Sequence, residues 1–103
     1  MNIIIKSTNM NLSPEMKNFV EEKISSVDKF YPDILEARVE IEYQEQMKKG
    51  NNYRCEVNIS IPGKLIRVEK STPDFTKSVN KVKDHLKVVL SKERSKNIGK
   101  RKI

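Results

Sequence analysis

The chain has 103 residues, a length that supports one domain with a single hydrophobic core. Hydrophobic residues make up 36% of it and charged residues 34%, and no apolar run approaches the roughly 18 residues of a membrane span. The net charge of +7 is concentrated in residues 51–103, where fourteen Lys and Arg stand against five acids, whereas residues 1–50 carry a net charge of −2. Such an asymmetry indicates a surface that meets a polyanion. The single cysteine, Cys55, excludes an internal disulfide and a thiolate zinc cluster, as expected in a reducing cytoplasm.

The first two expected elements are a short strand and a helix. Ile3 and Ile5, flanked by Asn2 and Lys6, predict a short strand that ends before Thr8. Ser13-Pro14-Glu15 then supplies an N-cap, a proline at the first helical position and an acid in the first turn. The helix predicted over residues 14–30 ends before Pro32, and one apolar stripe runs along it: Met16, Phe19, Val20, Ile24, Val27 and Phe30.

Three strands with one apolar face each are expected next, because apolar and polar residues alternate along them. The expected inward positions are Leu35, Ala37, Val39, Ile41 and Tyr43 in the first, Tyr53, Cys55, Val57, Ile59 and Ile61 in the second, and Ile66 and Val68 in the third. Pro62-Gly63 predicts the turn between the second strand and the third, which covers residues 64–70.

A second helix closes the predicted fold. Thr72-Pro73-Asp74 repeats the capping signature, and the helix carries Phe75, Val79, Val82, Leu86, Val89 and Leu90 on one stripe as far as about Arg94. The order βαβββα predicts an α+β fold of the double-stranded-RNA-binding type, with a four-stranded sheet, the first strand parallel to its neighbour and both helices on one face. Residues 1–95 would form this domain, and residues 96–103 a basic C-terminal tail without periodicity.

The sequence offers little for catalysis. It contains no phosphate-binding loop, nucleophile elbow, zinc-protease motif or CxxC pair. Glu36, Glu40 and Glu42 share one strand face, where a carboxylate active site is one reading and a solvated sheet face another. His85 lies at the boundary of the helix stripe, and Cys55 occupies an inward position typical of a small buried side chain. We therefore expect a protein that is not an enzyme, with no cofactor, metal or small-molecule substrate.

Basic residues flank the apolar stripe of the second helix on both sides. At 100° per residue, Lys83, Lys87 and Arg94 form one ridge, and Lys77, Lys81 and Lys92 form the other. Lysines at this density suit contacts with nucleic-acid phosphates, and the tail adds Lys96, Lys100, Arg101 and Lys102. A solvated helix face, a charge that only aids solubility and an anionic membrane are the alternatives. The membrane is disfavoured because the helix has no bulky apolar face beyond what the core needs.

Two further observations concern the mode of binding. Lys23 lies inside the apolar arc of the first helix, either as a lysine whose stem packs while its head reaches solvent, or as an ammonium directed along a groove between the helices. Tyr43 and Tyr53 have inward parity, and the outward sheet face has no aromatic residue. A base-stacking platform on the sheet is therefore excluded, and the nucleic acid is expected on the helix side.

The ordered set of residues across positions 1–95 resembles the bacterial ribosome hibernation promoting factors, a family that includes the ribosome-associated inhibitor A (protein Y) branch. The similar segments are Ile5 through Ser13, Phe19-Val20-Glu21-Glu22-Lys23-Ile24, Asp28-Lys29-Phe30, Glu56-Val57, Gly63, Glu69, Asp74-Phe75, Val79-Asn80 and Asp84-His85-Leu86. Lys23 and Lys29 stand at lysine positions of the family. Thr76, His85 and Val88 depart from its usual residues, and the chain is expected to be a short form without the dimerising C-terminal domain of long members.

The resemblance implies a cytoplasmic translation regulator of stressed and stationary-phase cells. It would bind the small ribosomal subunit and its rRNA, near ribosomal proteins of the decoding region, and occupy the channel for messenger and transfer RNA in idle ribosomes. The nucleic-acid-binding residues expected on this basis are Lys23, Lys29, Lys77, Lys81, Lys83, Lys87, Lys92 and Arg94. A general double-stranded-RNA-binding module is the alternative in the same class, and a small enzyme that uses the strand carboxylates is the alternative from another.

Overall fold

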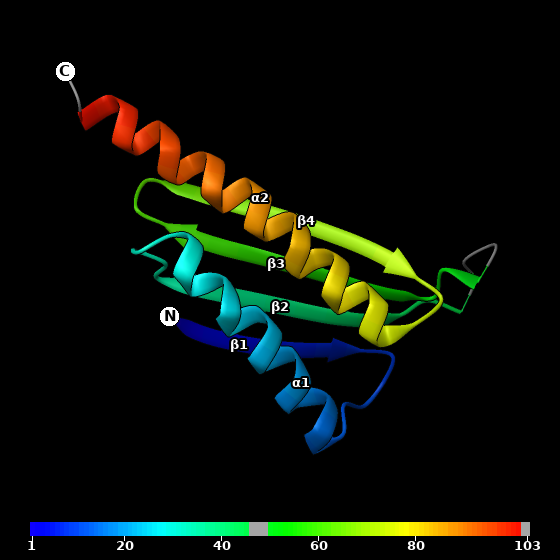
Figure 1. The fold of residues 1–103 in the computed structure, drawn as a ribbon. Coiled ribbons are helices and arrows are strands. Elements are labelled where there is room, and N and C mark those ends of the chain that lie inside the picture. Colours follow the sequence, from blue (N-terminus) through cyan, green and yellow to red (C-terminus); the bar gives the residue numbers. More distant parts are fainter. Residues whose placement is uncertain (46–49, 102–103) are drawn as a thin grey trace.

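The computed structural model describes residues 1–45 and 50–101, with the side chains of residues 97–101 left out. Figure 1 shows a single sheet with both helices packed on the same face. The elements are β1 (Asn2–Thr8), α1 (Pro14–Ser25), the 3₁₀ helix η1 (Ser26–Phe30), β2 (Glu36–Tyr43), β3 (Tyr53–Ile61), β4 (Lys64–Thr72) and α2 (Phe75–Arg101). The predicted α+β fold with the order βαβββα is confirmed.

The sheet has the strand order β1-β2-β3-β4. β1 pairs in parallel with β2, where Ile3 lies opposite Ala37, and the other two pairings are antiparallel. Pro62 and Gly63 alone connect β3 to β4, and Gly63 has a φ of +77°. A tight turn with proline followed by a left-handed residue favours glycine at this second position, so the predicted turn is confirmed.

The core lies between the sheet and the helices. Fully or almost fully buried side chains come from the inward positions of β2, β3 and β4 and from one stripe on each helix: Val20, Ile24, Ala37, Val39, Ile41, Cys55, Val57, Ile59, Ile61, Ile66, Val68, Val79, Val82, Leu86 and Leu90. Leu35, expected to point inward, is instead 60% exposed. It precedes the first residue of β2, so the alternation of the strand does not extend to it.

The first helix is not one continuous α-helix. The α-helical part ends at Ser25, and residues 26–30 continue as η1. The hydroxyl of Ser25 donates to the carbonyl oxygen of Glu22 at 3.1 Å, and that of Ser26 donates to the carbonyl oxygen of Lys23 at 2.6 Å. Serine hydroxyls that bond back to the preceding turn compete with regular helical hydrogen bonding, which accounts for the change to the tighter helix here.

The second helix differs from the prediction at both ends. Its N-cap is Asp74 rather than Thr72, because the Asp74 carboxylate accepts a hydrogen bond from the backbone N–H of Thr76 at 2.9 Å. The hydroxyl of Thr72 bonds instead with that of Ser78 at 2.7 Å.

At its C-terminal end the helix continues to Arg101, about two turns beyond the end predicted near Arg94. Residues 96–101 are therefore helical rather than an aperiodic tail. The sequence has no proline after Pro73 that would end the helix earlier. Lysine and arginine are favourable in a last helical turn, and a single glycine is not enough to end the helix. Lys102 lies outside the described residues, and the domain boundary itself stays a prediction. No helix of the described part of the chain is long and apolar enough to cross a membrane.

Candidate nucleic-acid interface

A basic depression lies between η1 and α2 on the helix side of the molecule. Its volume is about 160 Å³, and its lining residues are Ser26, Lys29, Phe30, Lys83, Asp84 and Lys87. Lys29 and Phe30 come from η1, whereas the other charged residues come from α2. The fold thus brings Lys29 to the ridge of Lys83 and Lys87, although more than fifty positions separate them in the sequence.

The ring of Phe30 organises the lysines of this depression. The Nζ atom of Lys29 lies 5.3 Å from the ring centroid and that of Lys87 lies 5.4 Å from it. Both distances are within the range of cation–π attraction, which holds an ammonium near an aromatic surface without neutralising its charge. Lys83 is placed differently, with its Nζ atom 3.4 Å from the Asp84 carboxylate. Two of the three ammonium groups are therefore held in place while keeping their full charge for a phosphate.

Lys23 and Arg94 extend the basic surface from this depression. Lys23 lies in the last turn of α1, half-buried, with its Nζ atom 5.6 Å from the centroid of Phe19. The Phe19 ring in turn contacts Phe75 of α2, at 6.1 Å between centroids, so this lysine lies on the side of α1 that faces α2. Arg94 is exposed and follows Lys87 along the same side of α2, about 10 Å farther along the helix axis.

The second predicted ridge is not part of this depression. Lys77, Lys81 and Lys92 are all exposed on α2, but helical geometry places them on the flank opposite to Lys83 and Lys87. Since α2 also packs on β3 and β4, that flank lies toward the β4 edge of the sheet. The eight predicted residues, seven lysines and one arginine, thus divide into a group of five at the boundary of η1, α1 and α2 and a separate group of three. Their role in binding stays a prediction.

The outer face of the sheet carries an ion-pair network centred on Arg54. Its guanidinium bonds to the carboxylates of Glu42 at 2.7 Å, Glu56 at 2.6 Å and Glu69 at 2.9 Å, and also to that of Glu40. Burial alone would lower the pKa of Arg54, but these hydrogen bonds together raise it above its usual value. Alternation along the strands predicted which residues point outward. It could not find this network, because the network depends on which residues of neighbouring strands lie side by side.

Arg67 adds to the same network from β4. It bonds to Glu56 at 3.0 Å and to Glu69 at 3.1 Å. Hydrogen bonds from Arg67, then from Asn58 and Arg54, lower the pKa of Glu56 to about 2. Glu56 is thus held as an anion, chiefly by Arg67. That is unfavourable for a general acid and repels a phosphate backbone.

The remaining candidates for chemistry are placed unfavourably for it. Cys55 is fully buried, and burial raises the pKa of its thiol to about 12, so it carries almost no thiolate near neutral pH. His85 is exposed on α2. Within residues 1–45 and 50–101, no three His, Cys, Asp or Glu side chains are grouped so that they could hold a metal ion.

Sequence reasoning missed Phe30 as a part of the candidate site. Its place in the apolar stripe of the first helix predicted a core residue, whereas the structure leaves it half-buried, with lysines from two elements against its ring. The adjacent lysine in Lys29-Phe30 was the one signal in the sequence. The contribution of Lys87 required the packing of α2 against η1.

Comparisons with known proteins agree with this architecture. The family model described as "Sigma 54 modulation protein / S30EA ribosomal protein" matches residues 3–98. A protein of Deinococcus radiodurans named ribosome hibernation promotion factor is 28% identical over 97 residues, which are 94% of this chain and 51% of that protein. The chain therefore spans about half the length of this curated relative.

Two solved structures share the fold. The N-terminal domain of Thermus thermophilus Protein Y has a TM-score of 0.76 at 24% identity, covering 89% of this chain and 98% of the other. A ribosomal subunit interface protein from Coxiella burnetii has a TM-score of 0.80 at 20% identity, covering 92% and 99%. The match of the family model over almost the whole chain confirms the resemblance found in the sequence: this chain belongs to the Sigma 54 modulation protein / S30EA ribosomal protein family.

Proposed function

We propose that this chain binds the small ribosomal subunit in the channel that carries messenger and transfer RNA, and that it keeps idle ribosomes inactive without catalysing a reaction. Family membership supports a ribosomal partner, and the name of the Deinococcus relative supports a role in hibernation. A protein with this partner acts in the cytoplasm. The observation that carries the proposal is the basic depression between η1 and α2, where Lys29, Lys83 and Lys87 meet.

The chemistry of this depression suits phosphates of folded RNA. Ammonium groups bind phosphates irrespective of base sequence, so they position a protein on RNA by charge and shape. Conversely, the outer sheet face presents carboxylates already bonded to arginines, which disfavours RNA there. We therefore place the rRNA on the helix side, with Lys23 and Arg94 extending the contact from the depression. Lys77, Lys81 and Lys92 would meet RNA on the opposite flank of α2.

The shape of the molecule suits inhibition by occupation. The described residues form a rod with extents of 51 × 27 × 18 Å, with α2 projecting beyond the end of the sheet (Figure 1). A compact body that fills an RNA-lined channel excludes other ligands for as long as it is bound. Translation in a purified system should therefore fall as the protein approaches one copy per ribosome, and should recover when excess messenger and initiator transfer RNA compete. Cleaved rRNA at substoichiometric protein would instead indicate an enzyme.

Charge reversal in the depression tests the proposed surface. K83E/K87E should abolish co-sedimentation with purified small subunits in sucrose gradients, because two phosphate contacts become repulsive. The matched control is K6E/R38E, which changes the charge equally on the outer sheet face, where Lys6 is exposed and the Arg38 side chain is 68% exposed. The control should still co-sediment, and circular dichroism should show both variants folded. Equal loss in the two variants would mean that net charge, and not this depression, determines binding.

A competition experiment separates the proposal from a general double-stranded-RNA-binding module. A ribosome-bound factor should be displaced from small subunits by transfer RNA and should prefer subunits to bare duplex RNA of equal concentration. A general module should bind the bare duplex equally well and should not respond to transfer RNA.

A further inference from the structure

The two edges of the sheet differ in how they are protected against further strands. β4 forms one edge and carries charged residues along its length: Lys64, Arg67, Glu69 and Lys70. β1 forms the other edge, and its residues Ile3, Ile4 and Ile5 are followed by a single charged residue, Lys6. Charges on an edge strand oppose the addition of another strand, and an apolar edge lacks this protection. The edge of β1 is therefore the one open to a partner.

The backbone of β1 has hydrogen-bonding groups directed toward that open edge. The N–H of Asn2 donates to the carbonyl oxygen of Leu35 at 3.4 Å, and Asn2 lies opposite Glu36 in the parallel pairing with β2. Successive residues of a strand direct their backbone groups to opposite sides. Ile3 and Ile5 therefore present their N–H and C=O groups away from β2, where an added strand would bond to them.

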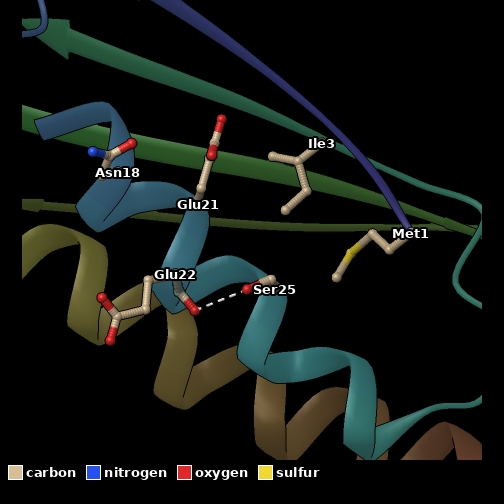
Figure 2. A pocket seen from close by; sticks show the side chains of 6 residues that line it. All are labelled: Met1, Ile3, Asn18, Glu21, Glu22 and Ser25. Atoms are coloured by element: carbon tan, nitrogen blue, oxygen red, sulfur yellow. Dashed lines mark hydrogen bonds between the residues drawn. The ribbon is translucent and has the colours of Figure 1, made fainter. Parts of the chain in front are cut away.

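A depression lies beside this edge, between β1 and α1. It has a volume of about 520 Å³ and is lined by Met1, Ile3, Asn18, Glu21, Glu22 and Ser25. Figure 2 shows the apolar side chains of Met1 and Ile3 on the β1 side and the polar side chains on α1. Met1 is 36% exposed, and Ile4, on the other face of the strand, is 42% exposed. An added strand would thus find apolar contacts on both faces of the sheet.

The depression between β1 and α1 carries a net negative charge. Glu21 and Glu22 are exposed, and neither carboxylate forms an ion pair within the described part of the chain. The α-amino group of Met1 is the one cationic group among the residues that line the depression, against these two carboxylates. The carboxylates of the outer sheet face differ in this respect, because arginines hold them. A segment with basic residues would satisfy Glu21 and Glu22 while its backbone pairs with β1.

We propose that the open edge of β1 binds an extended basic segment of a partner protein, which adds to the sheet as a fifth strand beside α1. The segment would alternate apolar residues with lysine or arginine, as strand addition with side-chain selection requires. A second copy of this chain fits less well, because pairing through its own β1 would bring the two glutamates of its α1 to the same place. The inference does not depend on RNA binding, since the depression between η1 and α2 is lined by other residues.

The test is a titration of the ¹⁵N-labelled full chain with a short synthetic peptide of alternating lysine and valine, followed by NMR. Amide shifts should change at residues 2–6 and along α1, and they should saturate. A peptide with glutamate in place of lysine should not bind. The lysine peptide with alternate backbone nitrogens methylated should also not bind. It keeps its charge, but without those N–H groups it cannot form the hydrogen bonds that pair it with β1.

Variants of the chain test the acidic residues. E21K/E22K should lower the affinity for the lysine peptide by about tenfold or more, since two surface ion pairs are replaced by repulsion. D28K/D33K, with the same change of charge at exposed positions outside this depression, should bind with affinity close to that of the unchanged chain. E21Q/E22Q provides a milder variant if the charge reversal disturbs folding, and should bind with intermediate affinity.

Several results would overturn the proposal. Shifts confined to the outer sheet face or to α2, or binding of the methylated peptide, would exclude strand addition at β1. Shifts at residues 2–6 that grow with protein concentration in the absence of peptide would identify a second copy as the occupant. K83E/K87E should bind the peptide normally, so failure of the ribosome proposal and failure of this one are distinguishable.

Discussion

Replacing Arg54 with methionine tests whether the network on the outer sheet face stabilises the domain. The Arg54 side chain is only 12% exposed and bonds to four glutamates from three strands. Three of these, Glu40, Glu56 and Glu69, lie directly opposite one another in the strand register. Like charges that face each other across strands are destabilising, so this row depends on the guanidinium between its members. Methionine keeps an unbranched stem of similar packing and removes the guanidinium, with its charge and its hydrogen-bond donors.

R54M is expected to lower the free energy of unfolding by about 3 kcal/mol at pH 7. Hydrogen bonds to charged groups contribute roughly 1.5–3 kcal/mol each when well buried, and removing one partner of a buried ion pair costs about 3–5 kcal/mol. We take the lower end because Glu69 is 41% exposed and Glu40 is 31% exposed, so solvent and Arg67 screen part of the repulsion. For a chain of this size the loss corresponds to a decrease in Tm of roughly 15 °C.

Urea denaturation followed by circular dichroism measures this difference, and R38M is the matched control. Arg38 is 68% exposed and, among the residues that the structure describes, pairs with Glu36 alone, so its loss should stay within about 0.5 kcal/mol. The difference between the R54M variant and the unchanged chain should also narrow as the pH falls toward 2, because protonation of Glu56, whose pKa is lowered to about 2, weakens its attraction to the guanidinium. A cost for R54M equal to that of R38M, or one that is the same at pH 2 and pH 7, would refute the reasoning.

The remaining predictions concern pH, thiol reactivity and salt. The pKa of Glu56 is lowered to about 2 from 4.5, chiefly by Arg67, so the contribution of Glu56 to stability is complete above about pH 4.5 and is lost as the pH falls toward 2. After solvent screening we expect this contribution to the free energy of unfolding to be about 1 kcal/mol. E56Q should therefore flatten the curve of stability against pH in this range. Cys55 should react with a thiol reagent at pH 8 at least about a hundredfold more slowly in the native chain than in urea, because burial raises the pKa of its thiol to about 12. Equal rates would show that the core around Cys55 opens readily. Affinity for small subunits should fall by about three orders of magnitude between 50 and 200 mM salt if roughly six phosphates are contacted, and a flat response would exclude lysine–phosphate contacts as the main source of affinity.

The sequence by itself was sufficient for the elements and for the face that each one buries. Alternation through Ala37, Val39 and Ile41 and the three-and-four spacing of Val79, Val82 and Leu86 predicted which side chains would be buried, and the structure confirms both sets. These patterns are reliable because burial of apolar side chains requires them to follow the periods of strand and helix. Element ends were less well predicted. The change to η1 and the N-cap at Asp74 depend on local hydrogen bonds that several neighbouring hydroxyls and carboxylates could make.

The candidate surfaces depended on tertiary structure to different degrees. The ridge of Lys83 and Lys87 follows from helical geometry, so the sequence alone indicated it. Its union with Lys29 and Phe30 required η1 to pack against α2, and the network around Arg54 required the register of three strands. Such contacts join residues far apart in the chain, and no local period specifies them. The sequence therefore determined which charges face solvent, whereas the packing of distant elements decided which of those charges act together.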